Sequence, residues 1–220
     1  MLARYQEPDK ILIPADSVSS LSVGSVNHID NSLLTYQAPT RYTRRGPATS
    51  YGIKPDVVHI GGIGDSRNSS FCTLDGLNKL KFDSHGTSLS APHIAKILAN
   101  IDLLSNETLS TNSLKALVIH NSFLPPCLSS KTLSKEARDF VGFGFPVNSQ
   151  TIIAKEENSF TFVFEGVLSK GQVGEFEFTW PKSLANANGK CRGRIKMTLV
   201  YSPPIDRQFG QEYLRANVDA

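Results

Sequence analysis

The segment Ser84–Ala95, SHGTSLSAPHIA, joins a glycine-containing turn to the start of an apolar helix. Apolar residues then follow at the 3.6-residue period of a helix: Ile94, Ile97, Leu98, Ile101 and Leu104. Pro92 falls in the first turn, where a missing N–H group does no harm. The pattern predicts a helix from Ser88 onward, with this serine in its first turn.

A serine at the start of a helix can have two roles. The unpaired N–H groups and the positive end of the helix dipole would stabilise an oxyanion that develops beside Ser88. Gly86 would let the backbone of a substrate approach closely. Serine is also a common helix cap, so the residues alone leave a catalytic and a structural role open.

Residues 1–150 alternate short apolar runs with helical patterns. Three such runs are bounded by Pro, Gly or Asp: Lys10–Ala15, Ser20–Val26 and Asp56–Gly61. Runs of this kind are typical of strands that are buried on both faces of a parallel sheet. A second helix is expected from about Asn112, with Ser110 or Thr111 as its cap. Residues 1–150 are therefore predicted to form an α/β domain, a partial parallel sheet with helices on both faces.

Residues 151–220 change to a period of two. Apolar side chains alternate with mostly polar ones in four runs: Phe160–Phe164, Phe176–Trp180, Ile195–Tyr201 and Leu214–Ala220. This pattern predicts antiparallel strands with one buried face, packed as a β-sandwich-like domain. Because the sequence stops inside the fourth run, the domain is expected to be incomplete.

The composition limits which binding partners and which cellular compartment are expected. The net charge of +3 is spread along the chain and does not indicate binding to nucleic acid. No apolar run is long enough to span a membrane. No signal-peptide core is present, and Cys72, Cys127 and Cys191 lie far apart, so reduced thiols and a cytoplasmic location are expected. No ligand spacing for zinc or calcium occurs, and no metal or cofactor is expected.

Residues 86–95, GTSLSAPHIA, resemble the nucleophile signature GTSxxxPHxxG of the subtilisin-like serine peptidases (subtilases, peptidase family S8). Leu89 stands where methionine is frequent, and Lys96 stands where glycine is usual. Further segments, in the family's order, extend the resemblance over about residues 10–150: Pro14–Asp16, Leu21–Asn27, Arg45–Pro47, Lys54–Val58, Gly142–Gly144 and Pro146–Asn148. The run His59–Gly62 departs from the family's Ala-Pro-Gly ending.

The resemblance implies a serine endopeptidase that acts on polypeptides and needs no cofactor. Ser88 would attack the scissile carbonyl group and form an acyl-enzyme, which water then hydrolyses. The Ser88 N–H group would donate to the oxyanion, and Gly86 and Thr87 would shape the approach of the substrate. The β-rich residues 151–220 resemble, more loosely, the sandwich domains appended to large subtilases.

The family's other catalytic residues have no counterpart in this sequence. No DTG-like motif for the acid, HGT-like motif for the base or AGN-like motif for the oxyanion asparagine precedes Ser88. The HGT of His85–Thr87 belongs to the serine motif itself. In subtilisin, loss of the histidine lowers turnover by about 10⁶, and loss of the asparagine by about 10²–10³. The chain alone is therefore expected to be inactive.

Two other interpretations stay open. A degenerate protein could keep the scaffold and bind a partner without catalysis, through the β-rich tail for instance. Alternatively, the chain could be one half of a split peptidase whose missing amino-terminal half supplies the acid, the base and the asparagine. A half of this kind is expected to expose an apolar strand edge, which favours association or aggregation.

None of the five histidines is expected to replace the missing base. His28 and His59 are expected to pack or to lie at the surface, and His93 is expected to be buried and hydrogen-bonded within the first helix. His120 falls at a helix end, where a cation suits the dipole. His85 lies three residues before Ser88 and is near enough to approach it, but it is expected to belong to the turn.

Overall fold

A computed structural model describes residues 10–47, 52–63, 71–74, 76–105, 108–154, 159–186, 188, 190, 194–206, 208, 214, 216 and 218. Two of the three expected strands are present, β1 (Val23–Val26) and β2 (Val57–Ile60). They pair in parallel, with Val23 opposite Val57 and Val26 opposite Ile60. This small parallel sheet is the centre of residues 10–154, which we call the body.

The strand expected at Lys10–Ala15 is wrong. Lys10 makes a single bridge to Arg45, and the residues after it form a turn in which the Ala15 N–H group donates to the Leu12 carbonyl oxygen (2.8 Å). Pro14 explains the difference, because it has no N–H group to give to a sheet ladder.

Both expected helices are confirmed. Helix α1 is Thr87–Leu104 and helix α2 is Thr111–His120. Ser110 caps α2, since its hydroxyl oxygen accepts from the Ser113 N–H group (3.2 Å). Two further helices were not predicted, α3 (Ser134–Val141) and α4 (Ser149–Ile153).

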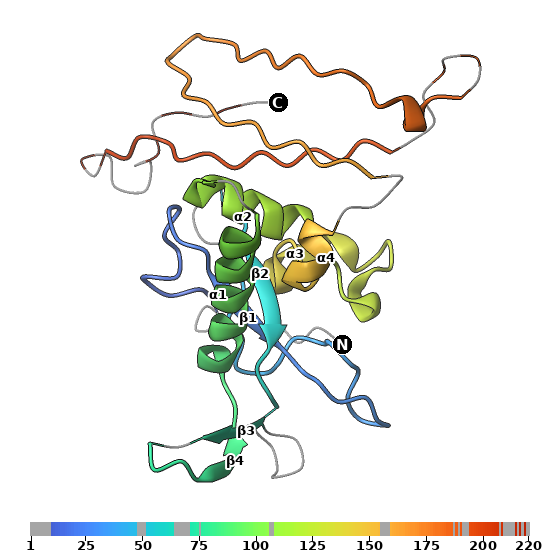
Figure 1. Cartoon of the computed structure of the whole chain (residues 1–220). Coiled ribbons are helices and arrows are strands. Elements are labelled where there is room, and N and C mark those ends of the chain that lie inside the picture. Colours follow the sequence, from blue (N-terminus) through green and yellow to red (C-terminus); the bar gives the residue numbers. More distant parts are fainter. Residues whose placement is uncertain are drawn as a thin grey trace.

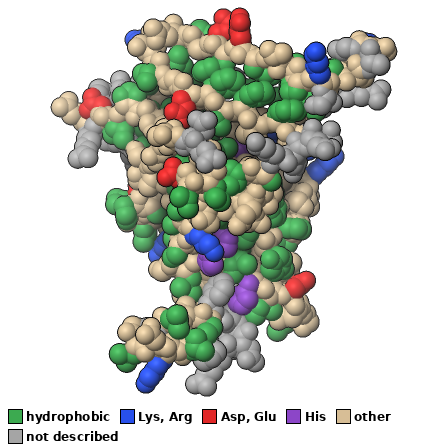
Figure 2. All heavy atoms as spheres, in the orientation of Figure 1, with side chains coloured by type: hydrophobic (Ala, Val, Ile, Leu, Met, Phe, Trp, Pro, Cys, Tyr) green, Lys and Arg blue, Asp and Glu red, His purple; other side chains and the backbone are tan. Residues whose placement is uncertain are grey.

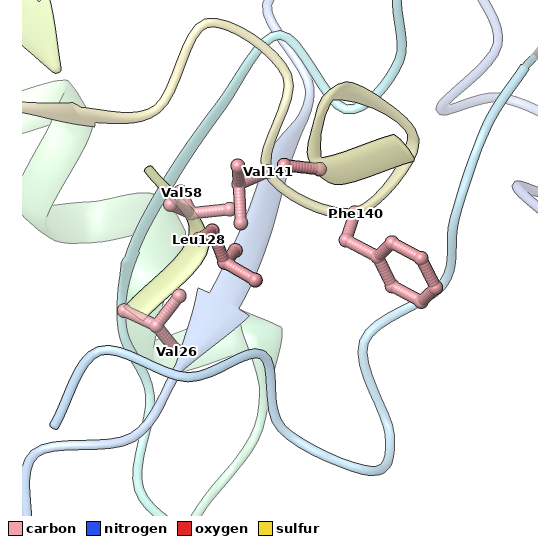
Figure 3. Close-up of a cluster of buried hydrophobic side chains, with 6 residues drawn as sticks. Val26, Val58, Leu128, Phe140 and Val141 are labelled. Atoms are coloured by element: carbon pink, nitrogen blue, oxygen red, sulfur yellow. The ribbon is translucent and has the colours of Figure 1, made fainter. Parts of the chain in front are cut away.

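Helices cover both faces of the sheet, as the sequence predicts for an α/β fold. Val57 points into a core with α1 and α2, whereas the next residue, Val58, points into a core with α3 and the short 3-10 helix Pro126–Leu128. The first core contains Val57, Ile94, Ile97, Ile101, Val118 and Ile119. The second, drawn in Figure 3, contains Val26, Val58, Leu128, Ala137, Phe140 and Val141. A strand with both faces buried explains why Asp56–Gly61 is apolar without alternation.

Smaller elements complete the body. The antiparallel hairpin of β3 (Phe71–Leu74) and β4 (Leu80–Ser84) projects from it and leads directly into α1 (Figure 1). The strands β5 (Ser122–Phe123) and β6 (Phe145–Pro146) pair beside β2. The expected open edge of β1 is partly covered, because the Ser25 N–H group donates to the Thr43 hydroxyl oxygen (2.9 Å).

The described residues from 159 to 218, which we call the tail, differ from the prediction. They run extended above α2 (Figure 1), but the described part contains no strand ladder. It has the bridge of Ile205 with Leu214, a bridge residue at Ala185 and the short 3-10 helix Lys182–Leu184. The predicted buried face is also wrong: Phe162 is 48% exposed and Phe176 is 51% exposed. A second sheet is not found in this part of the chain, and most of the run Leu214–Ala220 lies outside the described residues.

Candidate active site

Ser88 lies where the sequence predicts it, in the first turn of α1, and its side chain is exposed. Gly86 is the N-cap, and its carbonyl oxygen accepts from the Leu89 N–H group (3.0 Å). The hydroxyl group of Ser88 makes no hydrogen bond to any residue that the structure describes. The side chain is therefore open to a reactant from outside.

The backbone around Ser88 presents free donors. Gly86 has φ 138° and ψ 160°, a conformation that residues with a side chain rarely adopt. Its N–H group donates to the Gly61 carbonyl oxygen (2.8 Å), so it is not free for a ligand. Within the described chain the N–H groups of Thr87 and Ser88 have no acceptor, as expected for the first turn of a helix. These two groups, rather than that of Gly86, can receive an anion.

The end of β2 supports the turn that carries Ser88. A Cβ atom on Gly61 would lie 2.2 Å from the Ser25 hydroxyl oxygen, 2.5 Å from that of Ser90 and 2.8 Å from the Gly86 carbonyl oxygen. The Tyr42 hydroxyl group donates to the Gly61 carbonyl oxygen (2.7 Å) and lies 2.9 Å from the Ser25 hydroxyl oxygen. Only glycine fits between these groups, so the position of Ser88 depends on Gly61.

Sequence reasoning missed these supporting residues. Tyr42 lies in a loop far from the serine in sequence and belongs to none of the motifs. Gly61 appeared in the sequence as the end of the strand run Asp56–Gly61 and in a run that departs from the family pattern, but its supporting role was not predicted. A signal for it exists, since a glycine that directly follows a buried strand indicates a close approach of backbone.

Burial separates Ser88 from its neighbour Ser90. Ser90 is fully buried, and its hydroxyl group donates to the His59 carbonyl oxygen (3.0 Å). It fastens α1 to β2 and is closed to a substrate. Two serines of one helical turn therefore have opposite environments, and only Ser88 faces outward.

The histidines do not assemble a base beside Ser88 in the described chain. The ring of His85, an exposed residue, lies 5.5 Å from that of Tyr42, and no hydrogen bond joins it to the serine. His59 stacks on His93 (4.5 Å between centroids) and on Phe145 (4.6 Å). Burial, and then the nearby His93, lower the pKa of His59 to about 4, so this imidazole is neutral at physiological pH.

Two expectations about histidines are wrong. His93 is exposed on α1 and covers His59 instead of being buried itself. His120 does lie at the end of α2, but burial, and then Lys196, lower the pKa of its ring. The neutral His120 ring can hydrogen-bond to Thr198 (Nδ1 to Oγ1, 3.0 Å). The lowered pKa disfavours the protonated ring that was expected at this helix end.

A cavity of about 530 Å³ lies between α1, β6 and α4. His59, His93 and Lys96 line it together with Phe145 and residues 146–151. Ser88 and Gly86 are not among its lining residues, so this cavity is separate from the surface around the serine. Within the described residues no three His, Cys, Asp or Glu side chains converge as metal ligands.

The carboxylate of Asp56 has a structural role. Its Oδ2 atom accepts from Lys54 Nζ (2.6 Å), from the Ser22 N–H group (2.6 Å) and from the Ser22 hydroxyl group (2.9 Å). Lys54 is 3% exposed and also donates to the Ser20 carbonyl oxygen (2.9 Å). This network joins the starts of β1 and β2, at the opposite end of the strands from the serine turn.

Together these observations define an α/β protein with an exposed serine at the start of a helix that leaves a parallel sheet. Residues 4–159 match the model of the subtilase family, and the chain belongs to that family. It is also similar to the uncharacterized protein y4bN of Sinorhizobium fredii, at 26% identity over 227 aligned positions. The alignment covers 90% of this chain and 52% of the relative, so the chain spans about half the relative's length.

In the described part of the chain, no helix combines the length and apolar character that crossing a membrane requires. Cys72 and Cys127 are free thiols, and Cys191 lies outside the described residues.

Proposed function

We propose that Ser88 is the nucleophile of a subtilase-type serine endopeptidase. The observation that carries this proposal is the exposed hydroxyl group of Ser88 beside two N–H groups, of Thr87 and Ser88, that have no acceptor in the described chain. Membership of the subtilase family supports it. Gly86 adds open space, because the nearest atom to a Cβ placed there is the Ser88 nitrogen at 3.8 Å.

The proposed reaction is hydrolysis of a peptide bond. Ser88 Oγ attacks the carbonyl carbon while a base accepts its proton, and the carbonyl oxygen becomes an oxyanion that accepts from the Ser88 N–H group. The C–N bond then breaks, the proton passes to the leaving amine, and an acyl-enzyme remains. Water attacks this ester, its proton goes to the base, and Ser88 is released when it regains that proton.

We infer further that this 220-residue chain does not hydrolyse peptides by itself. An unassisted serine hydroxyl group is a weak nucleophile at neutral pH. In the described residues Ser88 lacks a hydrogen-bonded base, and the paired rings of His59 and His93 belong to another cavity. The base, the acid and the oxyanion asparagine would come from a second polypeptide or an upstream segment. The relative's twofold greater length supports this inference.

A fluorophosphonate probe tests both proposals, because it labels only a serine that a base activates. The purified chain should show negligible labelling. Co-expression with the product of any upstream reading frame that carries DTG-like and HGT-like motifs should produce labelling that Ser88→Ala abolishes. The control Ser90→Ala alters a buried serine and should keep some labelling.

The outcomes separate the alternatives. Labelling of the chain alone that disappears in Ser88→Ala would support the nucleophile and overturn the inactivity. A stable complex of the two polypeptides without labelling would favour the non-catalytic, partner-binding interpretation. Labelling that survives Ser88→Ala would reject Ser88 as the nucleophile.

We propose a cytoplasmic location for the chain, supported by the free thiols of Cys72 and Cys127. Alkylation of protein freshly recovered from its source cells should modify Cys72, which is exposed. Recovery of Cys72 in a disulfide would overturn this proposal.

A further inference from the structure

The tail carries a continuous apolar face that points away from α2. Contacts with α2 fix the direction of two of its extended segments: Glu165 Oε1 accepts from the Ser110 N–H group (3.1 Å), and Thr198 Oγ1 contacts His120 Nδ1 (3.0 Å). Val200 packs against the core of the body on the same side. Because side chains alternate along an extended segment, the intervening residues point outward.

Ring contacts confirm that the outward residues of the first two segments share one face, and the α2 contact of Thr198 places the alternating residues of the third on the same side. Phe162 contacts Phe178 (5.1 Å between centroids), and Phe164 contacts Phe176 (4.7 Å), across a turn closed by the Gln172 N–H group and the Ser169 carbonyl oxygen (3.0 Å). We call the whole set the aromatic face. It consists of Phe160, Phe162, Phe164, Leu168, Phe176, Phe178, Trp180, Ile195, Met197, Leu199 and Tyr201.

The aromatic face is exposed and carries no charge. Exposure ranges from 37% at Tyr201 to 72% at Met197 among its members with a stated value. The charged residues of the same segments, such as Glu165, Glu177 and Lys196, occupy the opposite alternation. Figure 2 shows hydrophobic side chains gathered over the tail. An uncharged apolar patch of this extent marks an interaction surface.

The area of the aromatic face matches the requirement of a stable dimer. Nine of these eleven side chains are about half exposed or more, and Tyr201 and Trp180 are less exposed; together they present on the order of 1,000 Å². A standard protein–protein interface buries about 800 Å² on each partner. A twofold-symmetric dimer needs a surface that complements itself, and an uncharged apolar surface has no like charges to oppose one another.

We propose that the aromatic face binds the aromatic face of a second copy of this chain, as two apolar layers packed face to face. This dimer supplies the second layer that an apolar face needs for burial. The interface lies at the α2 end of α1, whereas Ser88 lies near its beginning, 16 residues before Leu104, or about 24 Å of helix away. Dimerisation therefore leaves Ser88 accessible, and the proposal is independent of the proposed function.

Sedimentation velocity and light scattering of the full 220-residue chain test the proposal. The chain should be a dimer at tens of micromolar. Trp180, its single tryptophan, belongs to the aromatic face, and its emission should shift to the blue as the concentration rises. A double variant, Phe178→Glu with Met197→Glu, should weaken the dimer by at least 100-fold. The control Val167→Glu with Val173→Glu alters residues that are 95% and 90% exposed on the opposite alternation, and it should stay dimeric.

A measurement on the unaltered chain tests the interface without substitutions, so its result does not depend on whether a variant folds. Hydrogen exchange at dilute and concentrated conditions should show protection that rises with concentration in residues 159–181 and 194–202, with α1 unchanged. A monomer across the whole range would overturn the proposal, and so would an open series of oligomers without a dimer. Equal dissociation of the control and of the double variant would reject the aromatic face as the interface.

Discussion

The body and the tail use the same apolar residue types with opposite results. Val26, Val57 and Val58 in the body are fully buried, because α1 covers one face of the sheet and α3 the other. In the tail, Val167 is 95% exposed and the aromatic face is open. Hydrophobic patterning therefore fixes the conformation of a segment, but burial depends on a second layer, which the tail lacks within the described chain.

The two regions are also held by different forces. Apolar packing holds the body together, whereas polar contacts at α2 hold much of the tail: Glu165 at its start, and Thr198 and Lys196 at its end. Exposed hydrogen bonds contribute less than buried apolar area. We expect the tail to detach at a lower temperature than the body unfolds. Circular dichroism at 222 nm follows the helices of the body, and the fluorescence of Trp180 follows the tail.

The largest effect is expected for Asp56→Ala, which leaves the Lys54 ammonium group buried without its carboxylate. Breaking a buried pair in this way costs about 3–5 kcal/mol. The body should unfold at a lower temperature, and the tail should be lost with it because α2 is its support. Asp102→Ala, on the exposed face of α1, is the matched control and should change stability by less than about 0.5 kcal/mol. If denaturant titrations give the two variants the same free energy of unfolding, the structural role of the Lys54–Asp56 pair is contradicted.

A smaller effect is expected for Gly61→Ala. The added Cβ atom would meet two hydroxyl oxygens and the backbone at 2.2–2.8 Å, which costs about 1–3 kcal/mol. The strain displaces the turn that carries Ser88. In the proposed complex with a second polypeptide, fluorophosphonate labelling should therefore fall by a larger factor than the loss of folding stability alone explains. Gly76→Ala is the control, because no atom lies within 4 Å of a Cβ atom there. Unchanged labelling in Gly61→Ala would show that the turn does not depend on Gly61.

The body was largely predictable, because its sequence signals are local. The 3.6-residue period and the Ser110 cap predicted α1 and α2, and the apolar runs predicted β1 and β2. Helix α3 was missed since eight mostly polar residues are too short to show a period. The tail's alternation predicted its extended conformation and the common face of its aromatic rings, but not its exposure.

Only those residues of the candidate site that lie together in one short sequence motif could be predicted. Ser88 and Gly86 were found because the serine motif and the helix start coincide. Tyr42 was not, because its role arises from a loop that folds back over the end of β2. Lys54 and Asp56 would ordinarily be expected at the surface, and their burial depends on Ser20 and Ser22 in another segment.

The stability of the body should depend on pH through His59, which packs in the body and not in the tail. The pKa of His59 is about 4 in the folded chain against 6.5 when unfolded, so the unfolded chain binds more protons between these values. Stability should therefore fall as the pH decreases from 6.5 to 4. The expected loss is roughly 1–2 kcal/mol, less than the full shift implies because the ring is only partly buried. His59→Phe should keep the stacking and leave the smaller dependence from His120, with a contribution of the same sign from Glu165 below about pH 4.5. An identical pH profile in His59→Phe would reject His59 as the source.

The smallest effect is expected at the contact between the two regions. Hydrogen bonds from Ser113 and Ser110 lower the pKa of Glu165, so its carboxylate strengthens this contact above the ordinary pKa of 4.5 and loses that effect as the pH falls through the lowered value. Glu165→Gln removes the charge but keeps an acceptor for the start of α2. The Trp180 transition should move to a lower temperature at pH 7, while the helical transition of the body stays within about 1 °C, since an exposed charge contributes little to global stability. Glu177→Gln, a charge on the same alternation for which no contact with α2 is seen, is the control and should leave both transitions in place. If Glu165→Gln shifts both transitions together, the tail and the body form one cooperative unit, and the distinction between them does not hold.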